Sequence, residues 1–293
     1  MGSSKFIYKV SARVAALMTV FVTNTYAADL IAINSANQIS VFNVASAENA
    51  VFNTITGDAL GESFIGIDLR PSNSLVYGIT QSNKIFTIDA YSGNSTFVAN
   101  LANPVIAAGK SYGFDFNPVA DIGGAASLRL VSSSGDNYAV NVNTGAVTLA
   151  TSLIPGFTGV SYTNSNPSNP TTVPSSTALY YINSANDTLN VATTGFNNPS
   201  ISIIGGLGMD VLSANGFDID ANGIGYAAVN MDNGLLKSQL IRINTATGQA
   251  EWVSAFNGTI NGLTIAPVPE PETFAMLIAG LGLLGLSARR KPK

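Results

Sequence analysis

The chain has 293 residues, of which 13 are Lys or Arg and 17 are Asp or Glu, so its formal net charge is −4 at pH 7. It contains neither histidine nor cysteine. This excludes Ser-His-Asp catalysis, histidine-bound metals, thiolate catalysis and disulfides. Because only 10% of the residues are charged and 28 are glycine, the composition suits an exported β-rich protein with a neutral polar surface.

The first 27 residues have the parts of a secretory signal peptide. Basic residues precede an apolar run at 14–22, and Ala27 supplies a small residue at the cleavage position. The apolar run is too short to span a bilayer. We therefore expect cleavage after Ala27, export of the chain, and a mature body at 28–266.

The body at 28–266 is more acidic than the whole chain. It carries six Lys or Arg and fifteen Asp or Glu, a net charge of −9, because basic residues gather at the two chain ends. Such a body repels a phosphate backbone, so we expect no nucleic-acid partner. Solubility is the simpler interpretation of this acidity, and capture of cations is the alternative.

A glycine-apolar-Asp element recurs through the body. The segment 66–71 (GIDLRP) returns at 113–118 (GFDFNP), and the five glycines that start the copies are 47, 46, 57 and 46 residues apart. The long interval contains a Pro/Asn/Ser-rich stretch at 164–176, which we interpret as an insertion. The looser copies start at Gly159, Gly216 and Gly262. A repeat of this length predicts one supersecondary unit per period.

Each period contains four short apolar runs separated by turn residues. The third run ends in a turn of the form [Asn/Asp]-x-x-[Ser/Thr]-Gly, found at 89–93, 141–145 and 244–248. The Asn or Asp side chain caps such a turn, and its glycine adopts positive φ, which is hairpin chemistry. Four short antiparallel strands per period form the module of a β-propeller blade.

The two ends of the body complement each other. The mature chain begins with runs at 30–33 and 39–43 that match the second and third strands of a module, and it ends with a lone first strand at 262–265. The last strand can therefore complete the first blade and remove an exposed sheet edge. The sequence predicts an all-β fold, a five-bladed β-propeller closed by pairing of the N-terminal and C-terminal strands. An open β-solenoid or a pair of sandwiches is the alternative.

Asp68, Asp115 and Asp218 hold equivalent places on the predicted innermost strands. They could ring the central channel and bind a cation or sugar hydroxyls. The alternative, which the repetition favours, is that each carboxylate caps a neighbouring turn or accepts hydrogen bonds from backbone N–H groups between blades.

The segment 218–223 matches the first half of a calcium-binding loop. Asp218, Asp220 and Asn222 fall at the ligand positions of D-x-D-x-N-G, but the twelfth position is Val229 rather than glutamate. Asn-Gly is also a favoured two-residue hairpin turn. We therefore favour a turn, with a weak Ca²⁺ site as the alternative, and we expect no other cofactor.

Aromatic and acidic residues offer further candidates for sugar chemistry. Trp252 and the pair Tyr180-Tyr181 could stack on sugar rings, but we expect them in the core because blades bury aromatic residues between sheets. Glu62 and Glu251, with the inner aspartates, are the candidate carboxylates of a glycosidase, which needs two carboxyl groups about 5–10 Å apart. Because no glutamate lies at an inner-strand position, we expect no catalytic residue and no enzymatic activity.

The repeated elements resemble those of an uncharacterised domain family of secreted bacterial proteins, which has G-I-D-F-R-P and F-G-F-D-F-N-P elements and repeated N-x-x-T-G turns. The resemblance spans most of the body, through 66–71, 112–118 and the turns described above. This chain departs from the family at 121–126, a Gly/Ala-rich insertion. The family has no established activity, so the resemblance implies no catalytic residue.

The C-terminal segment at 267–293 joins a Pro-Glu-Pro tripeptide, an uncharged apolar run at 274–288 and a basic end. The apolar run predicts a helix about 23 Å long, shorter than the roughly 30 Å hydrocarbon core. The terminal cations favour the cytoplasmic side of the membrane. An ordinary single-pass anchor or a buried amphiphilic helix is the alternative. The tripeptide and the basic end consist of Pro269, Glu270, Pro271, Arg289, Arg290 and Lys291.

This order of parts resembles the PEP-CTERM sorting signal of Gram-negative, exopolysaccharide-producing bacteria. The resemblance implies an exosortase-type processing enzyme as partner, with Pro269–Pro271 as its recognition site and a transient stay in the inner membrane. It also implies that the processed protein resides in the cell envelope or outside the cell. We expect a non-catalytic exported protein, a binding or structural module whose body contacts exopolysaccharide or another partner in the extracellular matrix. A glycan-acting enzyme and a calcium-dependent adhesin are the alternatives.

Overall fold

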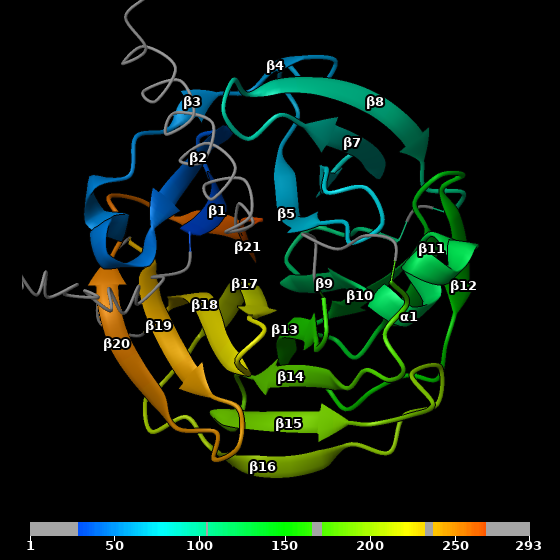
Figure 1. The fold of residues 1–293 in the computed structure, drawn as a ribbon, viewed down its shortest axis with the longest axis vertical. Helices are drawn as coiled ribbons and strands as arrows, with labels where there is room; N and C mark the ends of the chain where they lie inside the picture. Colours follow the sequence, from blue (N-terminus) through cyan, green and yellow to red (C-terminus); the bar gives the residue numbers. More distant parts are fainter. Residues whose placement is uncertain (1–28, 104, 166–171, 232–236, 268–293) are drawn as a thin grey trace, which may run out of the picture.

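The computed structural model describes residues 29–103, 105–165, 172–231 and 237–267. Within these residues the strands form five sheets arranged as blades around a central axis (Figure 1). The prediction of an all-β, five-bladed propeller is therefore confirmed for the body of the chain.

The first two blades contain the ends of the body and its first complete repeat. From the centre outward, the first blade comprises β21 (Ile260–Ile265), β1 (Asp29–Asn34), β2 (Gln38–Asn43) and β3 (Asn53–Thr54). The second blade comprises β5 (Phe64–Leu69), β6 (Val76–Thr80), β7 (Lys84–Ile88) and β8 (Asn94–Asn100). A short strand, β4 (Thr56–Gly57), joins the outer edge of β8 in parallel, which the repeat pattern did not predict.

The other three blades each follow one repeat. The third comprises β9 (Tyr112–Phe116), β10 (Ser127–Ser132), β11 (Asn137–Asn141) and β12 (Ala146–Leu149). The fourth comprises β13 (Phe157–Tyr162), β14 (Leu179–Asn183), β15 (Thr188–Ala192) and β16 (Ser202–Gly206). The fifth comprises β17 (Ser213–Ile219), β18 (Ile224–Asn230), β19 (Gln239–Asn244) and β20 (Ala250–Ala255).

Short helical segments occur only between strands in the described part of the chain. A 3₁₀ segment, η1 (Val44–Asn49), follows β2. α1 (Pro118–Ala120) and the π-helical turn η2 (Asp121–Ala125) join β9 to β10. The Gly/Ala-rich insertion therefore forms η2.

The first blade closes the ring with strands from both ends of the body. β1 pairs with β21 in antiparallel register, with Leu30 opposite Ile265 and Ala32 opposite Leu263. This confirms the predicted closure. It also gives β21 and the inner side of β1 a hydrogen-bonded neighbour, which completes the four strands of this blade.

The hydrophobic core is divided among the interfaces between neighbouring blades. Each of the five interfaces holds one cluster of buried apolar side chains. Between the second and third blades, for example, the rings of Tyr77 and Phe116 meet edge to face at 5.5 Å. Burying such a side chain contributes roughly 1.5–3 kcal/mol. Because both faces of most strands are covered, β6, β9 and β13 are buried along their whole length.

The repeated glycine of the inner strands has a steric reason. A Cβ atom at Gly113 would lie 2.8 Å from Cα of Gly159 in the next blade, and one at Gly262 would lie 2.4 Å from the backbone N of Ile67. Neighbouring inner strands therefore approach so closely that only glycine fits at these positions.

The turns after the third strands form as predicted. The Asp89 side chain accepts hydrogen bonds from the backbone N–H groups of Tyr91 and Ser92. Gly93 adopts φ 76° and donates its N–H to the Asp89 carbonyl. The turns that end at Gly145 and Gly248 have the same backbone bond and the same positive φ.

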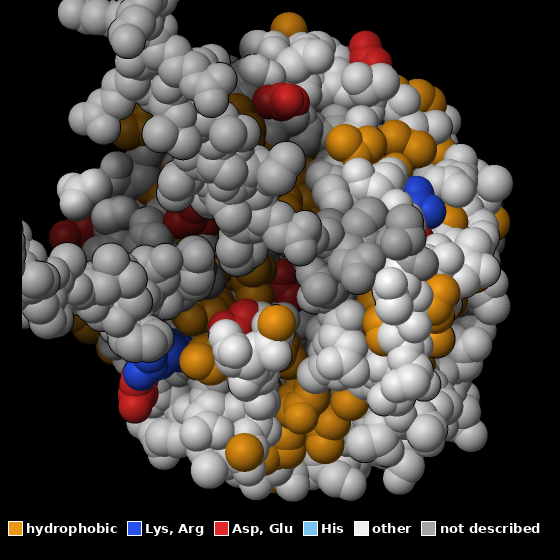
Figure 2. Space-filling model, viewed as in Figure 1, with side chains coloured by type: hydrophobic (Ala, Val, Ile, Leu, Met, Phe, Trp, Pro, Cys, Tyr) orange, Lys and Arg blue, Asp and Glu red, His pale blue; other side chains and the backbone are white. Residues whose placement is uncertain are grey.

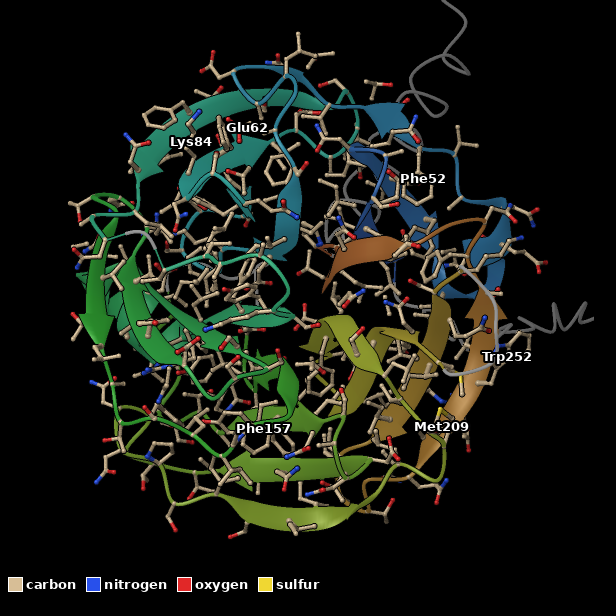
Figure 3. All side chains as sticks on the ribbon, turned by 180° about the vertical axis from the view of Figure 1, so that it is seen from behind. Phe52, Glu62, Lys84, Phe157, Met209 and Trp252 are labelled. Atoms are coloured by element: carbon tan, nitrogen blue, oxygen red, sulfur yellow. The ribbon has the colours of Figure 1, made fainter. Side chains whose placement is uncertain are left out.

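The expectation that Trp252 is part of the core is wrong. Its side chain is 61% exposed, because it lies on β20, the outermost strand of the fifth blade (Figure 3). The indole N–H donates to the Gln239 side chain at 2.7 Å, which holds the ring in place. Tyr181 is buried as expected, whereas Tyr180 is half-buried.

Several predictions concern residues outside the described part of the chain. These are the signal peptide with its cleavage after Ala27, the Pro269-Glu270-Pro271 tripeptide, the apolar C-terminal helix, and the basic end formed by Arg289, Arg290 and Lys291. Among the described helices, none is both long enough and apolar enough to cross a bilayer.

Candidate functional site: the inner polar ring and the fifth-blade groove

Five side chains at equivalent positions of the innermost strands surround the central axis. All five are buried, and we call them the inner polar ring. Acidic side chains are visible near the hollow centre of the molecule in Figure 2. The members are Asp68 of β5, Asp115 of β9, Ser161 of β13, Asp218 of β17 and Thr264 of β21.

Members of the inner polar ring bind the backbone of the following blade. Asp68 accepts a hydrogen bond from the N–H of Phe116 at 2.8 Å, and Asp218 accepts one from the N–H of Ile265 at 2.8 Å. The prediction that inner aspartates bond backbone N–H groups between blades is confirmed for these two residues. Because each such bond satisfies a buried donor, removing the carboxylate would leave an N–H group unpaired.

The Thr264 hydroxyl bridges two carboxyl groups. Its Oγ1 lies 2.9 Å from Oδ1 of Asp68 and 2.9 Å from Oδ2 of Asp218, and it also accepts the Leu69 N–H at 3.2 Å. One hydroxyl has one proton and can donate to only one of these oxygens. A proton on one of the two carboxyl groups would make the second short contact a hydrogen bond as well.

The environment of the inner polar ring favours that proton. Burial raises the pKa of Asp68 and of Asp115 well above the ordinary value, and repulsion from the neighbouring carboxylates adds to the rise. Burial also raises the pKa of Asp218, although the Ile265 N–H and the Thr264 hydroxyl oppose the rise. In each case burial removes water from the charged carboxylate, and the hydrogen bonds to the carboxylate compensate for only part of this loss.

The three candidate calcium ligands point to different partners. Asp218 belongs to the inner polar ring, whereas Asp220 accepts the N–H groups of Asn222 at 2.9 Å and Ile224 at 2.8 Å. The segment therefore forms the favoured hairpin turn. The described residues contain no group of three or more acidic side chains placed to hold a metal ion, and the weak Ca²⁺ site stays a prediction.

The two glutamates proposed as glycosidase candidates lie in separate ion pairs. Glu62 accepts Lys84 Nζ at 2.7 Å on the second blade (Figure 3). Burial raises the pKa of Glu62, but the bonds from Lys84 and Ser82 outweigh burial and lower it overall. Glu251 accepts from Arg242 at 2.5 Å on the outermost strands of the fifth blade. Neither glutamate joins the inner polar ring.

A polar groove of about 640 Å³ lies on the fifth blade, at the turns of the β17–β18 and β19–β20 hairpins. We call it the fifth-blade groove, and its walls carry amide, hydroxyl and paired charged groups. The Gln249 amide N–H₂ donates to the carbonyls of Leu207 and Ala250, which fixes the side chain from one end. The lining residues used below are Asn222, Arg242, Asn244, Thr247, Gln249 and Glu251.

Amides in the fifth-blade groove are anchored at one end only. The Asn244 carbonyl oxygen accepts the N–H of Ala246, and the Asn222 amide nitrogen donates to Asp220. The opposite ends of these two side chains, and the Gln249 carbonyl oxygen, make no hydrogen bond within the described residues. Such fixed groups with unused donors and acceptors can bind hydroxyl-rich ligands.

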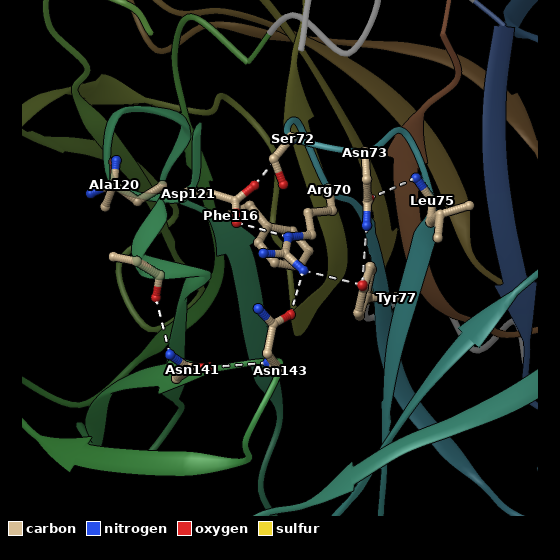
Figure 4. A network of polar contacts seen from close by, with 12 residues as sticks. Arg70, Ser72, Asn73, Leu75, Tyr77, Phe116, Ala120, Asp121, Asn141 and Asn143 are labelled. Carbon is tan, nitrogen blue, oxygen red and sulfur yellow. Dashed lines mark hydrogen bonds and ion pairs between the residues drawn. The ribbon is translucent and has the colours of Figure 1, made fainter. Parts of the chain in front are cut away.

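A buried cation outside the predicted sites braces the second and third blades. Arg70 Nε contacts Asp121 at 2.8 Å, and Nη1 donates to both Tyr77 and Asn143 (Figure 4). Asp121 also accepts the N–H of Ser72. Sequence reasoning identified the insertion that carries Asp121 but not this pairing. Asp121 is the only acidic residue of that insertion, and this feature of the sequence could have indicated an ion pair.

Comparison with known proteins identifies both parts of the chain. A family model described as "Domain of unknown function (DUF4394)" matches residues 38–265, and a model described as "PEP-CTERM protein-sorting motif" matches residues 267–291. No match was found among curated proteins.

Solved structures resemble the chain at low identity. Regucalcin from Agrobacterium tumefaciens, a calcium-binding protein, is 13% identical with a TM-score of 0.43 over 78% of this chain and 73% of that one. A protein of unknown function from Bacteroides thetaiotaomicron is 15% identical with a TM-score of 0.47 over 76% and 56%. BamB from Moraxella catarrhalis is 17% identical with a TM-score of 0.33 over 76% and 57%. The assignment of five blades rests on strand pairing rather than on these similarities.

Proposed function

The chain belongs to the DUF4394 family and ends in a PEP-CTERM sorting motif, and on this premise we propose that it is a non-catalytic, exported polysaccharide-binding module of the Gram-negative cell envelope. Exosortase is the enzyme that recognises such a motif, so the chain has an exosortase-type processing partner. In this proposal, processing at the Pro269–Pro271 tripeptide places the propeller at the cell surface or in the extracellular matrix.

The fifth-blade groove is the observation that supports binding to polysaccharide. Sugars present many hydroxyls that both donate and accept, and the groove offers half-anchored amides beside the Arg242–Glu251 pair. Because these side chains are already fixed by internal bonds, binding would require little further ordering. The net charge of −9 of the body disfavours anionic polymers at low salt, so a neutral polysaccharide is the proposed ligand.

The arrangement of carboxyl groups supports a binding role rather than catalysis. Asp68 and Asp218 are buried and bonded to the backbone of neighbouring blades, and Glu62 and Glu251 are held in ion pairs on other strands. A glycosidase requires two carboxyl groups that both face one sugar. We therefore propose that the propeller body binds glycan without cleaving it.

Replacing both members of the Arg242–Glu251 pair by alanine is expected to weaken binding to a neutral polysaccharide at least about tenfold, the loss of roughly 1.4 kcal/mol. The pair is 50% and 64% exposed, so the double variant should keep its stability. Affinity electrophoresis in gels containing dextran, a cellulose derivative or alginate measures the retardation of each variant.

The matched control is the double variant Lys84→Ala with Glu62→Ala, which removes an ion pair on the second blade. This variant should be retarded like the unaltered protein. Three results would each contradict the proposal. They are equal retardation of the two double variants, stronger retardation by alginate than by the neutral polysaccharides, and release of reducing ends from the gel polysaccharide.

A further inference from the structure

Four buried polar atoms between the third and fourth blades lack a hydrogen-bond partner within the described residues. They are Oδ1 of Asp115, Nε of Arg129 and the hydroxyl oxygens of Tyr162 and Tyr181. The exposed fractions of these residues are 2%, 5%, 0% and 0%. Leaving such atoms unpaired costs about 1–3 kcal/mol each, and more where the group is charged.

Strand register places the four side chains on facing surfaces. Asp115 and Arg129 are paired across β9 and β10, and Val131 follows Arg129 on the same side of β10. Tyr162 and Tyr181 occupy one face of the β13–β14 pair. Val131, Tyr162 and Tyr181 all belong to the apolar cluster between these two blades. The four polar atoms therefore meet inside one interface.

Arg129 has hydrogen bonds but no ion pair. Its two terminal nitrogens donate to the Asn137 and Asn197 side chains at 2.9 and 2.8 Å. Among the described ion pairs, none includes this guanidinium. Burial raises the pKa of Tyr162, and both the Arg129 charge and side-chain interactions with Arg129 and Asn117 oppose that rise. The guanidinium thus lies close to the tyrosine hydroxyl, yet Arg129 Nε and the Tyr162 hydroxyl each lack a hydrogen bond of normal geometry.

We infer that these four atoms form an internal binding site for one or more ordered water molecules, which link Arg129 and Asp115 of the third blade to Tyr162 and Tyr181 of the fourth. A buried water typically makes two to four hydrogen bonds to polar groups that are otherwise unpaired. The site has that number of free groups, and they come from both blades.

The chemistry of the groups selects water over an ion. Arg129 Nε can only donate, the Asp115 carboxyl oxygen accepts when ionised and can donate when protonated, and the two tyrosine hydroxyls can do either. The ligand must therefore both accept and donate, as water does. A cation would face the guanidinium, and an anion would face the Asp115 carboxyl oxygen. The apolar side chains packed around these groups favour a ligand as small as water.

Substitution of Tyr162 by phenylalanine distinguishes a hydrated hydroxyl from an unpaired one. If the hydroxyl binds water, Tyr162→Phe should lower Tm by about 2–4 °C, the shift for the loss of one hydrogen bond in a domain of this size. If the hydroxyl has no partner, its removal should leave Tm unchanged or raise it. Tyr181→Phe should behave in the same way. The double variant should lose less than the sum, because the two hydroxyls share a ligand.

Tyr180→Phe is the matched control, because this residue lies on the opposite face of β14 and packs toward the fifth blade. It should leave Tm unchanged. A crystal structure of the body at high resolution, from a crystal soaked in bromide, should show a water peak within hydrogen-bond distance of at least three of the four atoms. An anomalous bromide peak at that place, direct contacts among the four atoms, or an unchanged Tm in Tyr162→Phe and Tyr181→Phe would overturn the inference.

Discussion

Replacing Gly262 by alanine is expected to reduce the free energy of unfolding by about 3 kcal/mol or more, or to prevent folding. The new Cβ would lie 2.4 Å from the backbone N of Ile67 and 2.8 Å from Cα of Gly66. Both atoms belong to the main chain of β5, so no side-chain rotation relieves the clash. The closing strand β21 would have to move away from the second blade. Urea unfolding followed by far-UV circular dichroism measures the loss.

Gly258→Ala is the matched control for this prediction. Gly258 lies between β20 and β21, and a Cβ there would meet nothing within 4 Å. We expect a change of less than about 0.5 kcal/mol, as for an ordinary surface substitution. Equal stability of Gly262→Ala and Gly258→Ala would show that the inner strands do not approach as closely as described.

Raising the pH is expected to destabilise the protein. Burial and mutual repulsion raise the pKa values of Asp68, Asp115 and Asp218, so the folded state binds more protons than the unfolded state above about pH 3.9. This stabilisation is fully present below that pH and is lost as the pH rises through the folded-state pKa values. A tenfold difference in proton affinity between the folded and unfolded states corresponds to about 1.4 kcal/mol of stability.

Partly exposed carboxylates act in the opposite direction but weakly. Burial raises the pKa of Asp136, but the bonds from Lys110 and Ser132 and the Lys110 charge together outweigh burial and lower it, which adds stability as the pH rises. The Asp136 side chain is 27% exposed, and an ion pair that water reaches contributes less than a buried group. The inner polar ring should therefore dominate, and urea midpoints should fall between pH 5 and pH 8.

Asp115→Asn isolates the contribution of the inner polar ring. Oδ1 of Asp115 has no hydrogen-bond partner within the described residues, so an amide nitrogen can take its place and donate to the water inferred above. This variant should fold and should lose less stability between pH 5 and pH 8 than the unaltered protein. Asp136→Asn, the control, should keep the full loss. Urea midpoints that rise from pH 5 to pH 8 in the unaltered protein would contradict this account.

The architecture was predictable because the repeat appears in the residues that contact neighbouring blades. The repeated glycine within each inner strand permits close approach, and turns such as 89–93 carry both a capping side chain and a glycine with positive φ. The order of partial modules at the two ends indicated the pairing of β1 with β21. In these elements the residues that form the local strand or turn are also the residues that close packing of the blades requires. The sequence pattern therefore predicts them.

Contacts between distant segments were not predictable. The periodic pattern marks Trp252 as a strand residue but does not show that nothing covers β20. The Arg70–Asp121 pair joins a repeated element to an insertion, and no spacing rule relates the two. Thr264 occupies the place of the repeated aspartate, which was visible in the sequence. Its contacts with two carboxyl groups depend on how the ring closes.

Disulfide formation between β1 and β21 tests the closed ring most directly. The chain has no native cysteine, so a bond in the double variant Ala32→Cys with Leu263→Cys can join only these two register partners. We predict near-complete oxidation within the monomer, measured as intact mass under non-reducing conditions. The pair Ile31→Cys with Leu263→Cys, whose side chains point to opposite faces, should stay reduced. Free thiols in the first variant, or equal oxidation of both, would contradict closure of the propeller by its two ends.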